Sequence, residues 1–424
     1  MTVVGTRSSD TEGTKSPFRN RRGALRNAVL LGPAFVAAIA YVDPGNVAAN
    51  ITAGARYGFL LVWVLVLANL IAMLIQYQSA KLGIVTGRSL PGLLGERLGR
   101  RSRLAFWAQA EVVAIATDLA EVLGGAIALQ LLFDLPLVLG GVIVGVVSLL
   151  LLLLQNPQQQ RIFERVILGL LAIIVIGFLA GLVVNPPPAG DVLGGLVPRL
   201  QGSETILLAA SMLGATVMPH AIYVHSSLVI DRHGVADTES RKRWLVRVTR
   251  WDVGIALAVA GAVNIALLLL AAQNLRGKEG TDTIEGAYHA VADAMGPVMA
   301  TAFAIGLLAS GLAATSVGST AGAAIMGGLL RLRIPLLIRR VVTIIPALVV
   351  LGLGVDPTWA LVISQVVLSF GIPFAVIPLA RYTSDRSLMG DLADGWPLRV
   401  GAGVASVLIV VLNITLIGLI FTGT

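Results

Sequence analysis

Two short polar segments, each containing a proline, interrupt long apolar stretches of this sequence and carry the side chains best suited to bind a cation. They are Asp43-Pro44-Gly45-Asn46 and Met218-Pro219-His220. Proline removes a helical hydrogen bond and glycine lowers the cost of non-helical backbone, so each segment is predicted to break its helix and to free carbonyl groups for binding. A simple kink without function is the alternative for either proline taken alone.

An aspartate, an asparagine three residues later and a methionine in the second segment would form a site of mixed hard and soft donors. A carboxylate is costly inside a bilayer, and neither apolar stretch contains Lys or Arg to balance Asp43, so a cation from outside the chain is the expected partner. Asn46 adds a neutral oxygen. The Met218 thioether favours Mn²⁺, Fe²⁺ or Cd²⁺ over Mg²⁺ and Ca²⁺, which prefer oxygen ligands. A methionine that only fills space in the core is the alternative.

The composition assigns these segments to a membrane protein with several spans. Of the 424 residues, 56% are hydrophobic and 13% are charged, whereas soluble domains carry about 25% charged residues. This excludes a disordered chain and a nucleic-acid binder that relies on a basic face. The absence of cysteine excludes disulfides and thiolate metal sites. The net charge of +8 is attributed to basic loops rather than to a nucleic-acid partner.

Eleven stretches are long enough to cross a bilayer as helices, which takes about 20 apolar residues each. The predicted spans are 28–55, 58–80, 104–133, 136–154, 162–184, 204–229, 252–273, 298–329, 335–353, 358–380 and 398–421. With this division, all lysines and arginines except Arg56, Arg199, Arg276 and Lys278 fall on one side of the membrane. The positive-inside rule then places the N-terminus in the cytoplasm and the C-terminus outside a cell membrane.

The two interrupted spans occupy corresponding places in two halves of five spans each. Since five is odd, the second half must enter the membrane from the opposite side, and broken helices in an inverted repeat are typical of a transporter's substrate site. We therefore expect a cytoplasmic tail (1–27), a first five-helix repeat (28–184), a second, inverted repeat (185–380), and a cytoplasmic loop with an eleventh helix (381–424).

The two segments resemble motifs of the Nramp family of divalent metal transporters, in particular its bacterial, MntH-type members. The similarity is carried by Ala40-Tyr41-Val42-Asp43-Pro44-Gly45-Asn46 and by Met218-Pro219-His220-Ala221-Ile222-Tyr223-Val224-His225-Ser226. The resemblance implies a LeuT-like fold and proton-coupled uptake of Mn²⁺ and related ions. It also implies metal ligands at Asp43, Asn46 and Met218, joined by the backbone carbonyls of Ala40 and Ala215. A related branch that carries Mg²⁺ lacks the methionine.

Three acidic residues of the third predicted span, Glu111, Asp118 and Glu121, share one helical face. Asp118 and Glu121 lie deeper in the membrane and are predicted to relay protons, whereas Glu111 is expected to form an ion pair near the helix end. The resemblance implies that these deeper acids belong to a proton route distinct from the metal route, with Arg339 and Arg340 as positive partners. Asp43, besides binding the metal, is expected to help release or relay a proton. Anchoring at the membrane surface is the alternative for both arginines.

Three further polar residues lie in apolar spans. His220, beside the second break, is a candidate for pH sensitivity, while His225 is expected to be a hydrogen-bonded packing residue. The resemblance makes Gln365 a conformational gate or an additional ligand; a hydrogen bond to a neighbouring helix is the alternative. Gly45 and Pro219 are expected to support the gating movement at the two breaks.

The sequence therefore predicts a secondary transporter that imports Mn²⁺, Fe²⁺ or Cd²⁺ with protons by alternating access. It predicts no enzyme activity, no cofactor, no nucleic-acid partner and no obligate protein partner. The expected partners are divalent metal ions, protons and the lipid bilayer. A Na⁺-coupled amino-acid transporter of the same architecture is one alternative, with Thr315, Ser316 and Ser319 as sodium ligands. A Mg²⁺-transporting relative is another, and a membrane enzyme or receptor is the third.

Overall fold

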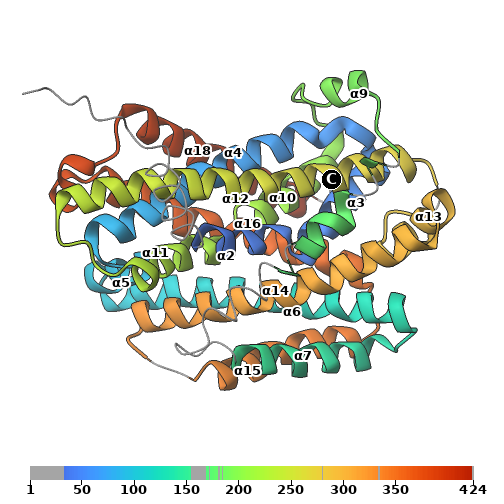
Figure 1. The fold of residues 1–424 in the computed structure, drawn as a ribbon, viewed down its shortest axis with the longest axis horizontal. Helices are drawn as coiled ribbons and strands as arrows, with labels where there is room; N and C mark the ends of the chain where they lie inside the picture. Colours follow the sequence, from blue (N-terminus) through green and yellow to red (C-terminus); the bar gives the residue numbers. More distant parts are fainter. Residues whose placement is uncertain are drawn as a thin grey trace, which may run out of the picture.

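The computed structural model describes residues 33–153, 169–170, 172–179, 182–183, 185–278, 280–332 and 335–422. Long helices run side by side along the longest axis of the molecule (Figure 1). The α-helices with printed bounds are α2 (Pro33–Ile39), α3 (Pro44–Tyr57), α4 (Val62–Thr86), α5 (Leu90–Arg97), α6 (Arg100–Phe133), α7 (Leu137–Leu153), α9 (Ala189–Gly194), α10 (Gly202–Thr216), α11 (Pro219–His233), α12 (Glu239–Asn274), α13 (Ile284–Met295), α14 (Pro297–Leu329), α15 (Leu336–Gly352), α16 (Pro357–Ser384), α17 (Arg386–Met389) and α18 (Trp396–Thr422). Short 3-10 helices are η1 (Ala40–Val42), η2 (Gly58–Leu61) and η3 (Gly390–Leu392).

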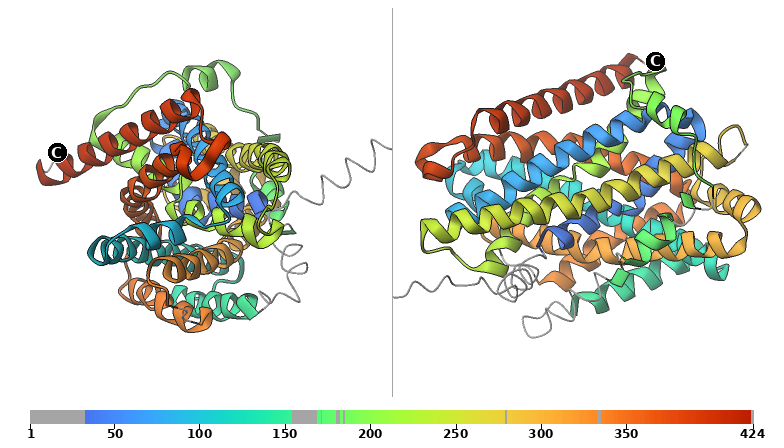
Figure 2. Two further views of the ribbon diagram at one scale, coloured as in Figure 1. Left: turned by 90° about the vertical axis from the view of Figure 1, so that its left-hand side faces the viewer. Right: turned by 45° about the horizontal axis from the view of Figure 1, so that its top comes forward.

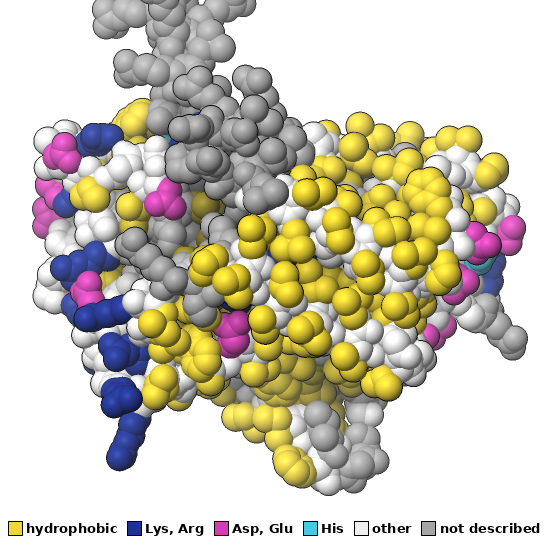
Figure 3. Space-filling model, turned by 90° about the horizontal axis from the view of Figure 1, so that it is seen from below, with side chains coloured by type: hydrophobic (Ala, Val, Ile, Leu, Met, Phe, Trp, Pro, Cys, Tyr) yellow, Lys and Arg dark blue, Asp and Glu magenta, His cyan; other side chains and the backbone are white. Residues whose placement is uncertain are grey.

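Seven helices of the described residues are long and apolar enough to cross a membrane, and α7 is a shorter apolar helix. Hydrophobic side chains cover the middle of the visible face, while Lys and Arg gather at one end (Figure 3). This distribution is that of a membrane protein whose apolar belt contacts lipid. Nearly half of the predicted fifth span (162–168, 171, 180–181 and 184), and residues 28–32 of the first, lie outside the described residues, so eleven spans remain a prediction.

Several helices extend beyond the predicted span limits. The structure extends α4 to Thr86 and begins α12 at Glu239, whereas the sequence predicted limits at 80 and 252. Hydropathy marks the part of a helix that lies in hydrocarbon, and basic residues such as Lys81 continue the helix beyond it. Lys81 is itself buried, and its charge is balanced by Asp394. Lys81 Nζ donates to Asp394 Oδ1 at 2.7 Å, and Gln78 Nε2 donates to Asp394 Oδ2 at 2.7 Å.

Both predicted helix breaks are present. The first chain segment passes through η1 and becomes extended at Asp43 (φ −78°, ψ 166°) before α3 begins at Pro44. The second leaves α10 at Thr216 and is again non-helical at Met218 (φ −61°, ψ 120°) before α11 begins at Pro219. In both cases proline occupies the first helical position, where its missing N–H costs nothing.

The breaks meet in the interior of the helix bundle. Helix α3 packs against α12 and α16, and α10 packs against α16, α4 and α3. Two outer groups flank this centre, α18 on one side and α7 with α15 on the other (Figure 2). The carbonyl of Tyr41 accepts from Asn264 Nδ2 at 2.7 Å, and that of Val42 accepts from the Ser310 hydroxyl. These partners satisfy the freed backbone, which lipid could not do.

Candidate metal centre

The candidate ligands lie at the junction of the two broken helices and are shielded from the surface. Asp43, Asn46, Ala215 and Met218 have no exposed surface, and Ala40 is 1% exposed. Asp43 caps α3, Met218 precedes α11, and Ala215 belongs to the last turn of α10. The breaks therefore bring the Asp43 carboxylate, the Asn46 amide and the Ala215 carbonyl together, and Met218 follows three residues after Ala215 along the chain.

Asn46 joins the two broken helices directly. Its Nδ2 donates to Asp43 Oδ1 at 2.8 Å and to the Ala215 carbonyl at 2.9 Å. The Asn46 backbone N–H also donates to Asp43 Oδ1 at 2.8 Å, and the Thr216 hydroxyl donates to Asn46 Oδ1 at 3.4 Å. The amide hydrogens thus face the two oxygen atoms that the sequence reasoning offered to a cation. The sequence analysis did not identify Thr216. A hydroxyl-bearing residue directly beside the second break was the feature that could have indicated its role.

Gln365 covers the Asp43 carboxylate from α16. Its Nε2 donates to Asp43 Oδ2 at 3.3 Å and to Ser364 Oγ at 3.2 Å, while its buried Oε1 has no partner among the described residues. Two glycines make room for this residue. A Cβ at Gly45 would lie 1.7 Å from Gln365 Nε2, and a Cβ at Gly214 would lie 2.0 Å from the Gln365 carbonyl oxygen. Gln365 therefore touches both broken helices.

Acidic side chains and histidines alone do not make a metal site here. Within the described residues, no group of three or more His, Asp or Glu side chains could hold a metal ion. Any cation bound at the breaks would need amide, carbonyl or thioether donors in addition to Asp43, and among these only the thioether favours a transition metal over Mg²⁺ or Ca²⁺.

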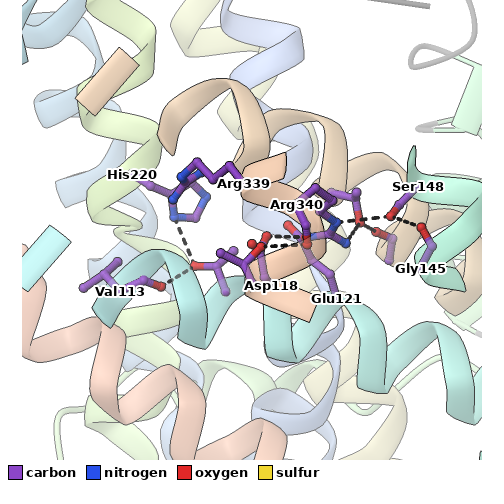
Figure 4. A network of polar contacts seen from close by, with 12 residues as sticks. Val113, Asp118, Glu121, Gly145, Ser148, His220, Arg339 and Arg340 are labelled. Carbon is purple, nitrogen blue, oxygen red and sulfur yellow. Dashed lines mark hydrogen bonds and ion pairs between the residues drawn. The ribbon is translucent and has the colours of Figure 1, made fainter. Parts of the chain in front are cut away.

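A separate network of buried charges lies between α6 and α15 (Figure 4). Arg340 Nη1 contacts both Asp118 Oδ1 and Glu121 Oε2, the latter at 3.2 Å. Arg340 also donates to Thr315 Oγ1 and to Ser148 Oγ, each at 3.1 Å. Two carboxylates thus share one fully buried guanidinium. Removing one side of this pairing would leave a buried charge without its counter-charge.

The second arginine takes a different partner. Arg339 Nη2 lies 3.1 Å from Glu111 Oε1, so Glu111 is in an ion pair. A Cβ at Gly322 would lie 1.5 Å from Arg339 Nη1, which shows that the guanidinium packs into a gap on α14. Arg339 is only 6% exposed, so simple anchoring at the membrane surface does not describe it.

The two histidines differ in their surroundings. His220 Nδ1 lies 3.3 Å from the hydroxyl of Thr117, the residue before Asp118, so His220 lies between the second break and the charge network (Figure 4). His225 Nδ1 lies 2.6 Å from Gln76 Oε1, and Gln76 Nε2 reaches the Tyr41 hydroxyl. Gln76 and Thr117 were not identified from the sequence, because a single polar residue in an apolar span gives no sign of its partner.

Comparisons with known proteins show which family and fold the chain resembles. The family model described as Natural resistance-associated macrophage protein-like matches residues 34–419. A divalent metal cation transporter MntH from Mycobacterium tuberculosis is 60% identical over 394 residues, covering 93% of this chain and 92% of the relative. The manganese transporter of Eremococcus coleocola, solved with an aromatic bis-isothiourea substituted compound, has a TM-score of 0.84 at 31% identity, covering 94% and 89% of the two chains.

A more distant structure supports the fold alone. Mhp1, a nucleobase-cation-symport-1 family transporter in a closed conformation, has a TM-score of 0.59 at 17% identity and covers 91% of this chain and 92% of its own. The all-helical, LeuT-like fold predicted from the sequence is thereby confirmed.

Proposed function

Since this chain belongs to the Nramp family, we propose that it is a secondary transporter that imports Mn²⁺ and related divalent transition-metal ions across a cell membrane. The observation that carries the proposal is the meeting of Asp43, Asn46 and the Ala215 carbonyl at two broken helices, with Met218 at the second break. Transport of this kind requires neither a resident cofactor nor catalysis.

The metal ion would bind to Asp43, Asn46, Met218 and the carbonyls of Ala40 and Ala215. Because Asn46 Nδ2 donates to Asp43 and Ala215, the amide must turn about its terminal torsion to offer Oδ1 to the ion. The hydrogen bonds it gives up are replaced by metal–oxygen contacts from the same two oxygens. The thioether supplies selectivity, since Ca²⁺ and Mg²⁺ gain little from sulfur.

Protons would follow the separate network of Asp118, Glu121 and Arg340. Glu121 Oε1 is buried without a partner among the described residues, so it is free to accept a proton. His220 would act between the two sites, because it follows Met218 and Pro219 along the chain and contacts Thr117, the residue before Asp118. Asp43 would take part in both routes, because binding of a cation disfavours protonation of the same carboxylate.

Alternating access would come from movement of one helix bundle around the breaks, with Gln365 closing over Asp43. The N-terminus would face the cytoplasm and the C-terminus the outside. The cytoplasmic tail would end at residue 27, the first repeat at 184 and the second, inverted repeat at 380. We propose that transport requires no obligate protein partner.

The sodium-coupled alternative is disfavoured by the surroundings of α14. Thr315 Oγ1 donates to the Gly311 carbonyl at 2.8 Å and accepts from Arg340. An arginine therefore already uses an oxygen that a sodium ion would need. The Mg²⁺ alternative is disfavoured by Met218, since an all-oxygen shell has no use for a thioether.

Uptake into proteoliposomes tests the proposal. Met218→Ala should raise the ratio of Ca²⁺ to Mn²⁺ uptake about tenfold, a change of about 1.4 kcal/mol in discrimination, whereas Met212→Ala, a buried methionine of α10, should leave the ratio unchanged. Asp43→Asn should abolish Mn²⁺ uptake. Full Mn²⁺ transport by Asp43→Asn would refute the metal site.

Proton coupling needs its own measurement. A pH-sensitive dye inside the vesicles should report acidification during Mn²⁺ uptake by the wild type, and much less acidification per Mn²⁺ with Glu121→Gln. Equal acidification per Mn²⁺ in the two proteins would remove Glu121 from the route while leaving the metal site intact.

A further inference from the structure

A pocket of about 520 Å³ lies between α5, α6 and α16, at the end of the molecule where basic residues gather. We call it the interfacial pocket, and it is lined by Leu94, Arg97, Leu98, Phe106, Ile377, Pro378, Arg381 and Tyr382. It shares no lining residue with the metal centre or the charge network. Its walls are therefore available for a role outside the transport path.

One side of the interfacial pocket is apolar and faces the lipid. Ile377 is 49% exposed, and its neighbour on α16, Phe374, is 40% exposed and meets Phe106 edge-on at 5.6 Å between ring centroids. Exposed side chains of this kind in a membrane protein contact acyl chains rather than water. The pocket is thus continuous with the hydrocarbon.

The other side is positively charged. The Arg97 guanidinium lies 5.2 Å from the Tyr382 ring centroid and 3.5 Å from Asp385, and its side chain keeps 43% of its exposure. Arg381 is exposed at the same rim, and no acidic side chain of the described chain forms an ion pair with it. One arginine is partly neutralised and the other is not, which leaves a net positive charge beside an apolar wall.

We propose that the interfacial pocket binds an anionic phospholipid, with one acyl chain on Phe106 and Ile377 and the phosphate between Arg97 and Arg381. Guanidinium groups bind phosphate oxygens in a two-pronged geometry, and basic pockets at the edges of membrane helices recognise anionic headgroups. A soluble phosphate would make no use of the apolar wall, and a neutral lipid would make no use of the arginines.

A second pocket of similar composition supports the same ligand class. It has a volume of about 460 Å³ between α4, α12 and the start of α18, and is lined by Met73, Leu74, Tyr77, Arg250, Val253, Gly254, Pro397 and Leu398. It again combines one arginine and one tyrosine with apolar side chains. The positive-inside prediction places both pockets at the cytoplasmic leaflet, where anionic lipids are common.

Lipid retention by the purified full-length protein tests this proposal. The protein is exchanged into detergent containing equal amounts of phosphatidylglycerol and phosphatidylcholine with the same acyl chains, and bound lipid is quantified by mass spectrometry. The wild type should enrich phosphatidylglycerol, and Arg381→Gln should lower the enrichment about fivefold, as expected for one arginine near a headgroup. Arg386→Gln, an exposed arginine at the same end outside both pockets, should not lower it.

Two further arms identify the ligand. Ile377→Gln should also lower retention, because the acyl chain loses its wall, and excess inorganic phosphate should not displace the lipid. Equal retention of the two lipids, or an Arg386→Gln effect as large as that of Arg381→Gln, would overturn the proposal. Displacement by inorganic phosphate would also overturn it in favour of a soluble anion. Unchanged Mn²⁺ uptake by Arg381→Gln would show that the variant is folded.

Discussion

Replacing Gly45 by alanine is expected to expel the Gln365 amide from the Asp43 carboxylate. The new Cβ would lie 1.7 Å from Nε2, 2.2 Å from Cδ and 2.7 Å from Cγ of Gln365, so the whole end of that side chain must move. The backbone at Gly45 is ordinary α-helix, and alanine is the better helix former by about 1 kcal/mol. Any loss of stability therefore comes from the contact with Gln365.

The size of the effect follows from two contributions. Forcing extra volume into a packed interior costs about 1–3 kcal/mol. Losing a hydrogen bond to a charged group costs about 1.5–3 kcal/mol. After allowing for the helix preference of alanine, Gly45→Ala should lower the free energy of unfolding by about 1.5–5 kcal/mol. In a Gln365→Ala background, where the clashing atoms are absent, the same change should be neutral or slightly stabilising.

A double-mutant cycle measures this difference. Unfolding by denaturant in mixed micelles is followed for the wild type, both single variants and the double variant, together with Mn²⁺ affinity by calorimetry. Gly403→Ala is the matched control, because that helical glycine of α18 has open space where the Cβ would be and should cost nothing. An equal cost of Gly45→Ala in both backgrounds would show that Gln365 is not the residue it displaces.

Three other outcomes are expected. Arg340→Gln leaves Asp118 and Glu121 buried without their cation and should lower the free energy of unfolding by about 3–5 kcal/mol; adding Glu121→Gln should recover part of this loss, and no recovery would refute the shared pairing. Lys81→Met removes the cation from the buried Asp394 and should lower the free energy of unfolding by a similar amount. In denaturant unfolding, the double variant Lys81→Met with Asp394→Leu should be more stable than Lys81→Met alone. Hydrogen bonds from Ser387 hold the pKa of Asp385 below its usual value, so its stabilisation is present above the unfolded-state pKa and is lost as the pH falls through the folded-state pKa; Asp385→Asn should remove this acid-side loss from a pH series of unfolding midpoints.

The parts of the fold that depend on chemistry within one segment could be predicted from the sequence. A proline with polar neighbours inside an apolar stretch marks a helix break wherever the chain goes afterwards, and both breaks were located at Asp43 and Met218. Helix ends were predicted less well, since the apolar stretch records only the part that lies in lipid. The start of α12 at Glu239 is set by its N-cap, where the Thr238 side chain accepts a hydrogen bond from the Arg241 N–H.

The contacts between distant segments could not be predicted in the same way. That Asn46 would donate to the Ala215 carbonyl, and that Gln365 would rest on Gly45, depends on how three helices pack. The sequence marked Gly45 as a residue that eases the helix break, but it gave no reason for glycine at 214 and 322. The Gln365 side chain opposite Gly45, the Gln365 carbonyl opposite Gly214 and the Arg339 side chain opposite Gly322 show why no Cβ fits. The burial of Lys81 likewise depends on Asp394, which lies 313 positions further along the chain.

The Asn46 amide also bears on how the carrier resets after delivering its cargo. With its NH₂ group held between Asp43 and the Ala215 carbonyl, the two half-helices are already bridged by a partial positive charge that belongs to the protein itself. In the unloaded protein the Asp43 carboxylate is therefore not left without hydrogen-bond donors in the buried interior.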